Sequence, residues 1–257
     1  KIEKLPKIKK ENLELLSKFA YYLNSSFDFS PNTNASYITS VKLYFEYEDT
    51  FSSENIKHYI IALEQQGMKP ATINLRITGL ERFGQFLGKK LNLKRAKVQK
   101  NLSTDNIPSE NEYKKICEYL IRNNDMRLYL QIRTLASTGA RISELLQFTW
   151  QHIIDGEVVL KGKGNKYRRF FFPKQLQDAV KKYIPKSEFD ESVMSGGKYG
   201  IISSRAFNMK LKGIAKKCNI SLEKMHAHAF RHYFAKMYLK SNKDIVALAD
   251  ILGHESI

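Results

Sequence analysis

The feature that most constrains the fold is the spacing of apolar residues, which keeps a helical period through most of the sequence. Within residues 1–88, successive segments place apolar residues on one helix face. The first such face comprises Leu13, Leu16, Ala20 and Leu23. The breaks between segments fall at Ser30-Pro31, at Ser52-Ser53 and from Gly67 to Pro70. Because no segment alternates in the two-residue period of a strand, we predict a small bundle of four helices.

One stretch of the second half changes period. The sequence EVVLKGKGNKYRRFFFP, residues 157–173, contains two runs rich in β-branched and aromatic residues around a Gly-Lys-Gly-Asn turn. Such a pattern predicts a β-hairpin with a basic tip. The lysines of the tip are Lys161, Lys163 and Lys166.

Helical signals surround this hairpin. Ser109 and Glu112 have the spacing of a capping box, which predicts a helix start. We expect the following helices at about 127–138 (ending at Gly139), from Arg141 to Phe148, at about 174–184, at about 204–218 and after Asp244. The prediction is a mainly α protein with a helical domain at 1–88, a basic linker at 89–106 and a mostly helical domain with a small β-hairpin at 107–257.

The charge balance points to a polyanionic partner. The sequence has 43 Lys and Arg against 26 Asp and Glu, a net charge of +17. A positive field of this size suits nucleic acid, whose condensed counterions are released on contact. A soluble basic protein without such a partner is the alternative. No apolar run is long enough for a membrane span and no signal peptide is visible. The two cysteines, Cys117 and Cys218, have neither zinc spacing nor a disulfide framework, so we expect a reduced protein in the cytoplasm.

Basic residues are densest between the two predicted domains. Six of the twelve residues at 89–100 are Lys or Arg, and none is acidic. Such a segment suits a linker that lies on phosphates, although an ordinary solvated connection has the same composition. We predict DNA contacts from Lys94, Arg95 and Lys97 here, and from Lys69, Thr72 and Arg76 in the preceding helix.

The segment HAHAFRH, residues 226–232, places three histidines and an arginine within seven positions. His228 and Arg231 are three residues apart, so they point the same way on a helix. His228 and His232 have the spacing of a helical zinc pair, but no third ligand is apparent and Arg231 would place a cation beside the metal. A histidine bonded to the backbone inside the core is the other alternative.

Arg141 follows a glycine turn and precedes Glu144 by three residues. On its own this spacing suits a structural ion pair. Taken together, Arg141, Arg231, the histidines and a hairpin lysine suit a phosphodiester better than a metal. Forked guanidinium donors match phosphate oxygens, a histidine can relay a proton, and a lysine can protonate a departing alkoxide.

Four blocks of the sequence resemble the tyrosine recombinase (phage integrase-like) family. They are TGARISELLQFTW, LKGKGNKYRRFFFP, HAFRHYFA and ILGHESI, in the usual order. The first half resembles the core-binding domain of the family through PATINLRITGLERFGQFL. Conjugative-transposon integrases and Xer-type recombinases are the branches it resembles. The likeness implies a two-domain clamp around DNA, with a core-binding domain at 1–88 and a catalytic domain at 107–257.

The resemblance also implies residue roles. Arg141 and Arg231 look like the two phosphate-binding arginines, and His228 and His254 like the histidines of the last two blocks. Lys163 resembles the hairpin lysine that acts as general acid, with Lys161 and Lys166 as neighbouring candidates. Glu144 matches the acidic residue that supports the site from behind. His226 and His232 are expected to be structural neighbours.

The family nucleophile is a tyrosine about nine residues beyond the last histidine, which falls past Ile257. We therefore expect this stretch of chain to bind DNA without cleaving it. The implied mechanism joins the tyrosine to a 3′-phosphate and releases a 5′-hydroxyl, with no metal, ATP or other cofactor. The implied partners are double-stranded DNA, further copies of the chain (a dimer to a tetramer) and an accessory DNA-bending or excision factor. A non-catalytic DNA-binding protein with the same clamp is the alternative function, and a zinc-dependent nuclease built around residues 226–232 is a third.

Overall fold

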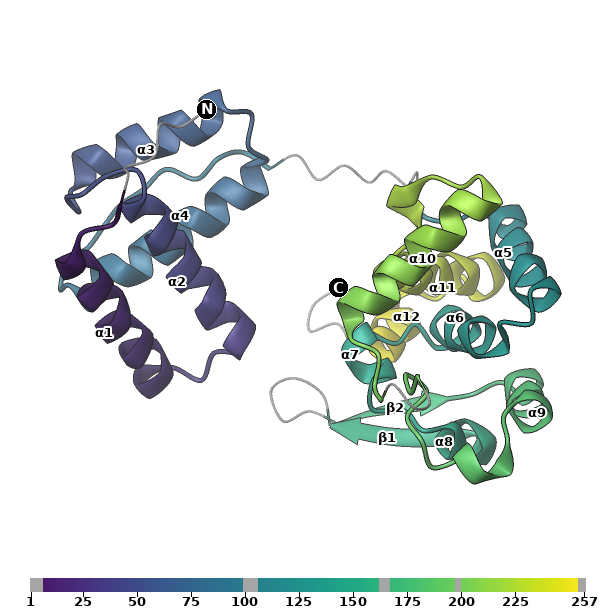
Figure 1. The fold of residues 1–257 in the computed structure, drawn as a ribbon. Helices are drawn as coiled ribbons and strands as arrows, with labels where there is room; N and C mark the ends of the chain where they lie inside the picture. Colours follow the sequence, from purple (N-terminus) through teal and green to yellow (C-terminus); the bar gives the residue numbers. More distant parts are fainter. Residues whose placement is uncertain (1–6, 99–105, 162–166, 197–199, 254–257) are drawn as a thin grey trace. The chain divides into compact units, whose positions relative to one another are not determined.

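A computed structural model describes residues 7–98, 106–161, 167–196 and 200–253. The chain divides into two compact units, Lys1–Asn101 and Leu102–Ile257, called the N-terminal and the C-terminal unit below. Figure 1 gives the order of the helices and strands. The dividing point lies inside the range predicted to be the basic linker, whereas the boundaries at residues 88 and 106 stay predictions.

The N-terminal unit is helical, as the apolar spacing predicts. Its described helices are α1 (Lys10–Ser26), α2 (Pro31–Phe45), α3 (Ser53–Gln65) and α4 (Pro70–Phe86). The helix starts coincide with the predicted breaks because the residues there are good caps. The Ser30 hydroxyl accepts from the amide of Thr33, and the Ser52 hydroxyl accepts from the amide of Asn55.

The buried face of α1 differs from the predicted one at its first position. Leu13 is 43% exposed, so its assignment to the buried face is wrong. Asn12 is buried instead, and its side-chain amide donates to the Asp49 carbonyl at 2.9 Å. This hydrogen bond places a polar residue where the apolar pattern expects leucine.

The core of the N-terminal unit is aromatic. The ring of Phe83 meets those of Phe19, Phe45 and Phe51 edge to face, at centroid distances of 5.1, 5.6 and 4.8 Å. Such geometry adds to the stabilisation from apolar burial. The core residues are uncharged, so this unit keeps its ionised groups outside.

The first part of the basic segment folds with this unit. Leu93 is buried in the aromatic core. The Asn74 side chain of α4 donates to the Ala96 carbonyl at 2.9 Å and accepts from the Ala96 amide at 2.8 Å. Arg95 adds contacts to Thr78 and Glu81 of the same helix. Residues 91–96 are therefore held against α4 by packing, by hydrogen bonds and by an ion pair.

The described part of the C-terminal unit consists mainly of helices, with a two-stranded hairpin at one edge (Figure 1), so the predicted mainly α fold class is confirmed. The Ser109–Glu112 capping box is present, and Gly139 ends the second helix of the unit. In chain order the elements are α5 (Glu110–Arg122), α6 (Met126–Thr138), α7 (Ile142–Leu145), α8 (Trp150–Asp155), β1 (Glu157–Lys161), β2 (Tyr167–Phe171), α9 (Lys174–Tyr183), η3 (Lys186–Glu188), α10 (Ser204–Cys218), η5 (Leu222–Lys224), α11 (Ala227–Asn242) and α12 (Ile245–Leu252).

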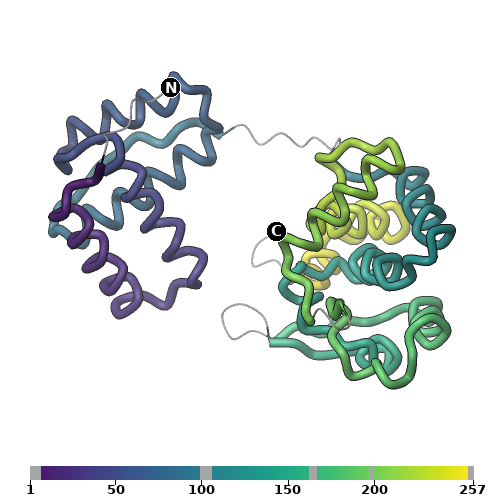
Figure 2. The backbone as a smooth tube through the Cα atoms, in the orientation of Figure 1, coloured from purple at the N-terminus to yellow at the C-terminus, as the bar shows by residue number. Residues whose placement is uncertain are grey.

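The hairpin and α7 show how far the predicted boundaries hold. The strands β1 and β2 pair antiparallel, with Val159 opposite Arg169, as the change of period predicts. Figure 2 shows the course of the backbone through the two units. The helix predicted from Arg141 to Phe148 is shorter, because α7 ends at Leu145. The following α8 starts at Trp150, where the Thr149 hydroxyl accepts from the His152 amide.

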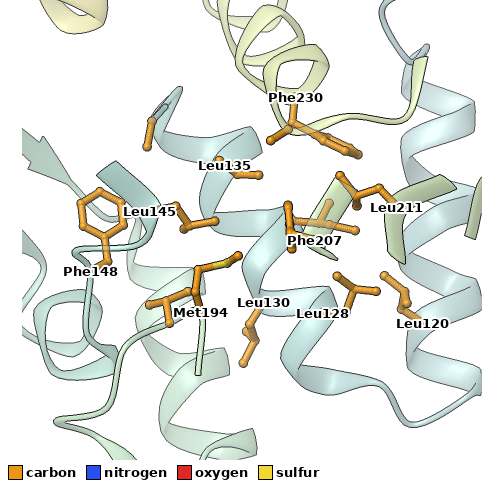
Figure 3. Close-up of a cluster of buried hydrophobic side chains, with 14 of the residues drawn as sticks. Leu120, Leu128, Leu130, Leu135, Leu145, Phe148, Met194, Phe207, Leu211 and Phe230 are labelled. Carbon is orange, nitrogen blue, oxygen red and sulfur yellow. The ribbon is translucent and has the colours of Figure 1, made fainter. Parts of the chain in front are cut away.

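The core of the C-terminal unit gathers around α6. Figure 3 shows Leu128, Leu130 and Leu135 of α6 among apolar side chains of neighbouring elements. The helix α11 packs on α6 and contributes Phe230, which is fully buried. This arrangement fixes the end of α6 at Gly139 beside α11 and α12, where the candidate site is found.

Candidate functional site

Three arginines from three elements meet at the end of α12. That helix starts at the Asp244 cap and ends at Gly253, whose φ of 63° is left-handed. The last carbonyls of a helix lack intrahelical partners and form the negative end of its dipole. Here three successive carbonyls, those of Ile251, Leu252 and Gly253, accept from Arg168, Arg231 and Arg141 respectively.

Arg231 is the most deeply placed of the three. It lies on α11, and the residue is 3% exposed. One guanidinium nitrogen donates to the Gly139 carbonyl at 2.7 Å and another to the Leu252 carbonyl at 2.7 Å. The guanidinium thus joins the C-terminal ends of α6 and α12. Burial, with Arg141 and Arg168 nearby, lowers the pKa of Arg231 to about 10, so it stays charged at neutral pH.

Gly139 allows these two helix ends to approach each other. Its φ is 61°, which side chains with a Cβ rarely adopt. A Cβ at this position would also lie 2.5 Å from Phe234 Cδ1 and 2.8 Å from Leu252 Cδ2. The glycine predicted as a helix end is therefore also required for close packing.

Glu144 holds two of the arginines with one buried carboxylate. The residue is 5% exposed. Its oxygens accept from the Arg141 amide at 2.6 Å, from Arg141 Nη1 at 3.2 Å and from Arg168 Nη1 at 2.7 Å. The i,i+3 ion pair is therefore present, as the spacing suggested. It does not cover Arg141, however, whose side chain is 43% exposed and can reach a ligand.

Arg168 is the member of this cluster that the sequence analysis missed. The signal for it was available in the alternation of β2. Arg168 shares a strand face with Phe170, which is buried, whereas Arg169 shares the opposite face with the exposed Tyr167 and Phe171. An inward-pointing arginine on a short strand needs a partner, and it has one in Glu144.

His226 precedes α11 as its N-cap, and His228 and His232 lie in the first two turns of this helix. The His226 side chain caps this helix, with Nδ1 accepting from the Ala229 amide at 3.1 Å. His228 and His232 are exposed and meet edge to face at 4.5 Å. Desolvation, followed by His232, Arg231 and other cationic neighbours, lowers the pKa of His228 to about 4. At neutral pH this ring is neutral and can donate or accept a hydrogen bond.

Among the described residues, no metal ligand set is assembled around residues 226–232. Among residues 7–98, 106–161, 167–196 and 200–253, no three His, Cys, Asp or Glu side chains lie close enough to share a metal ion. His226 already uses Nδ1 for the helix cap.

Two predicted site residues, Lys163 and His254, lie outside the described residues, as does Lys166. Lys161, the alternative hairpin lysine, is the exposed last residue of β1 and pairs with Tyr167. Arg141, Glu144, His228 and Arg231 do come together in the C-terminal unit: contacts link the first two, and the charges of Arg231 and Arg141 both lower the pKa of His228.

The predicted DNA-contact residues of the N-terminal unit differ in how available they are. Lys69, Lys94 and Lys97 are exposed, and Thr72 is half-buried. Arg76 is half-buried and donates to the Ser40 hydroxyl at 3.3 Å. Arg95 is engaged within the unit: it forms an ion pair with Glu81 and donates to Thr78 Oγ1 at 2.8 Å.

The chemistry of the cluster follows from its charges. Two guanidinium groups contact one carboxylate and a third lies near them, so positive charge is in excess at a place where Arg141 reaches solvent. The carbonyls of α12 offset part of the repulsion between the arginines. Such a group binds an anion with planar oxygens, above all a phosphate, and stabilises extra negative charge that develops on it.

Comparisons with known proteins agree with this chemistry. The sequence pattern described as "Phage integrase family" matches residues 108–257. The tyrosine recombinase XerD of Oceanobacillus iheyensis is 25% identical over 94% of this chain and 90% of its own. XerD of Halalkalibacterium halodurans is 27% identical over 94% of this chain and 89% of its own.

Solved structures share the fold. The Tn1549 transposon integrase in complex with circular intermediate DNA has a TM-score of 0.72 at 15% identity, covering 95% of this chain and 92% of its own. A lambda integrase dimer bound to a COC′ core site has a TM-score of 0.70 at 18% identity, covering 95% of both chains.

Proposed function

Because this chain belongs to the phage integrase family, we propose that it is a site-specific DNA recombinase that cuts and rejoins DNA through a 3′-phosphotyrosyl link. Attack by a tyrosine oxygen on a DNA phosphorus breaks the bond to the 5′ oxygen, which leaves as a 5′-hydroxyl. The 5′-hydroxyl of a partner strand then reverses the step. The energy of the broken bond is kept in the covalent link, so the reaction needs neither ATP nor a metal.

The observation that carries this proposal is the convergence of Arg141, Arg168 and Arg231 on the end of α12, with Glu144 between two of them. A transition state with an extra negative charge on phosphorus requires preorganised donors of this kind. Arg141 is exposed enough to meet a phosphate directly, and Arg231 is held from behind by two carbonyls.

The roles follow the family resemblance. Arg141 and Arg231 bind the phosphate, and His228, neutral near pH 7, hydrogen-bonds to it or relays a proton. Glu144 positions Arg141. Lys163 protonates the leaving 5′ oxygen and His254 completes the site. The nucleophilic tyrosine is expected about nine residues beyond His254.

The partner of the reaction is double-stranded DNA, and the chain acts as an oligomer on it. Lambda integrase has been solved as a dimer on a core site and as a tetramer bound to a Holliday junction, both with this fold. The basic excess of the sequence supports DNA binding. No described helix is long and apolar enough to cross a membrane. We place the protein on the bacterial nucleoid in the cytoplasm, where its DNA substrate lies.

The test uses a nicked duplex from the ends of the native mobile element, which traps the covalent intermediate because the short leaving strand diffuses away. A chain that includes the expected tyrosine should become linked to the DNA 3′ end, and exchange of that tyrosine for phenylalanine should abolish the link. A chain that binds the duplex without any covalent product would contradict the proposal and support the alternative, a non-catalytic DNA-binding protein.

A further inference from the structure

We infer that Arg168 is a positioning residue of the recombination reaction: it fixes the Glu144–Arg141 pair and the last turn of α12 to the hairpin strand β2. The inference rests on the proposed function. It assigns a role to a residue whose three side-chain nitrogens all donate within the protein, to the Ile251 carbonyl and to Glu144, rather than to a phosphate.

Arg168 contacts both the end of α12 and the Glu144 carboxylate of α7. Its Nε and Nη2 donate to the Ile251 carbonyl at 2.8 and 2.5 Å, and its Nη1 donates to Glu144 Oε2 at 2.7 Å. The guanidinium also lies over the Phe170 ring, 4.2 Å from the centroid. A planar fork can meet both acceptors in one orientation, whereas a lysine offers a single nitrogen.

Arg168 is connected to the phosphate-binding residues through its acceptor Glu144. Glu144 Oε2 accepts from both Arg168 Nη1 and the Arg141 amide, and Oε1 accepts from the Arg141 guanidinium. If Arg168 withdrew, the carboxylate would lose its other charged partner and could rotate toward Arg141 or toward solvent. The orientation of the Arg141 guanidinium would then no longer be fixed.

The second contact acts on the end of α12. Ile251 is followed by Leu252 and Gly253, whose carbonyls accept from Arg231 and Arg141. A shift of the last turn therefore moves the acceptors of both phosphate-binding arginines together. A misplacement of about 1 Å is enough to cost roughly 100-fold in a reaction rate.

The hairpin itself gains from this anchor. A two-stranded hairpin is marginal on its own, and the outward face of this one is exposed at Val159, Tyr167 and Phe171. Through Arg168 the strand is tied to α12 and α7 rather than to the apolar core alone. The same strand offers a matched control, because Arg169 is exposed on the outer face.

The experiment measures single-turnover formation of the covalent complex at saturating nicked duplex, with the full native chain that is expected to carry the tyrosine. Arg168→Lys should lower this rate by roughly 100-fold while the affinity for the duplex stays within about threefold. Arg169→Lys should react like the wild type. The fluorescence of Trp150, the buried single tryptophan of the chain, reports whether the C-terminal unit of each variant is folded.

A double-mutant cycle separates positioning from mere stabilisation. If Arg168 positions Arg141 and Arg231, the loss caused by Arg168→Lys should be smaller in a chain that already carries Arg141→Lys, because one of the two positioned arginines is then replaced. A loss of full size in the Arg141→Lys background would overturn the inference. Should Arg168→Lys fail to fold, Glu144→Gln, which keeps the shape of the carboxylate, replaces it in the same cycle with the same expectation.

The outcomes distinguish the two proposals. A wild-type chain that forms no covalent complex overturns the proposed function, and the inference with it. A wild-type chain that cleaves, together with an Arg168→Lys variant within about threefold of it, overturns the inference alone.

Discussion

Both units carry many positive charges, but they differ in where the charged side chains lie. In the N-terminal unit the core is uncharged and rich in aromatic rings, and the basic side chains lie at its surface or pair with surface acids. In the C-terminal unit charge enters the interior. Among the described residues, the buried side chains that carry a charge at neutral pH are Glu144 and Arg231, and both belong to this unit.

The difference indicates where the chemistry lies. Burying a charge is costly unless it is paired and hydrogen-bonded, so a fold that keeps two such groups at one place has a use for them there. Exposed lysines supply affinity for a polyanion, which depends on number and spacing. A fixed group of arginines supplies geometry, which a transition state requires.

The largest expected change in stability comes from substituting a glycine, and each unit offers one for comparison. Gly139→Ala should lower the free energy of unfolding of the C-terminal unit by about 3 kcal/mol, because the new Cβ meets Phe234 and Leu252 in a left-handed residue. Gly67→Ala in the N-terminal unit has a φ of 70° but open space, and should cost about 1 kcal/mol.

Denaturant titration checks this pair. Trp150 fluorescence follows the C-terminal unit and far-UV circular dichroism follows both. Equal losses of unfolding free energy in the two alanine variants would show that the close contacts at Gly139 add nothing to the cost of its left-handed backbone.

A smaller effect is expected where the basic segment meets α4. Asn74→Ala removes two hydrogen bonds to Ala96 and should cost about 2 kcal/mol in the N-terminal unit. Residues 91–96 should then exchange their amide hydrogens faster, as measured by mass spectrometry. Asn92→Ala, at an exposed position, is the control. Unchanged exchange in Asn74→Ala would mean that the packing of Leu91 and Leu93 and the contacts of Arg95 hold the segment without Asn74.

The lowered pKa values of three histidines predict that the stability of the C-terminal unit depends on pH. Desolvation is the main cause that lowers the pKa values of His226, His228 and His232. The positive charges of neighbouring histidines, Arg231 and Lys212 lower them further. The folded unit thus binds fewer protons than the unfolded chain, whose histidines titrate near 6.5. The free energy of unfolding should fall as the pH drops from about 6.5 towards about 4.

The control for this dependence is His226→Asn, which keeps a capping oxygen but does not titrate. The loss of stability between pH 7 and pH 5, followed by Trp150 fluorescence, should be smaller in the variant. Identical pH profiles would exclude His226 as a contributor.

The smallest effect concerns DNA affinity. Lys94→Gln/Lys97→Gln should reduce the slope of log affinity against log salt by roughly 0.9 for each lost phosphate contact. Arg95 is left in place because it is engaged with Glu81 and Thr78. The matched control is Lys18→Gln/Lys57→Gln, two exposed lysines on α1 and α3. An equal change of slope in both double variants would show that the basic segment makes no specific contact with the DNA phosphates.

Much of the fold follows from local rules. Helices α2 to α4 begin where a capping Ser or a Pro in the first turn favours a helix start, and the hairpin appears where the apolar period changes from helix to strand. These signals are local because capping and side-chain alternation act over a few residues. The same is true of Gly139, whose role as a helix end could be predicted.

What could not be predicted depends on contacts far apart in the sequence. Asn12 replaces Leu13 in the core because of Asp49, which follows 37 residues later. Arg168 matters because of Ile251, 83 residues away. The clustering of Arg141 and Arg231 was expected from the resemblance to a family, whereas their shared support on three successive carbonyls of α12 emerges only from the folded chain.

The most direct test of the account compares two charge-preserving substitutions, one in each unit, in a chain that carries the tyrosine. At saturating nicked duplex, Arg231→Lys should slow covalent complex formation by roughly 100-fold or more, since the lost fork acts mainly in the transition state. Arg76→Lys should leave that rate within about threefold. Cleavage by Arg231→Lys at a rate close to that of the wild type would contradict the claim that a fixed arginine cluster, rather than positive charge in general, performs the chemistry.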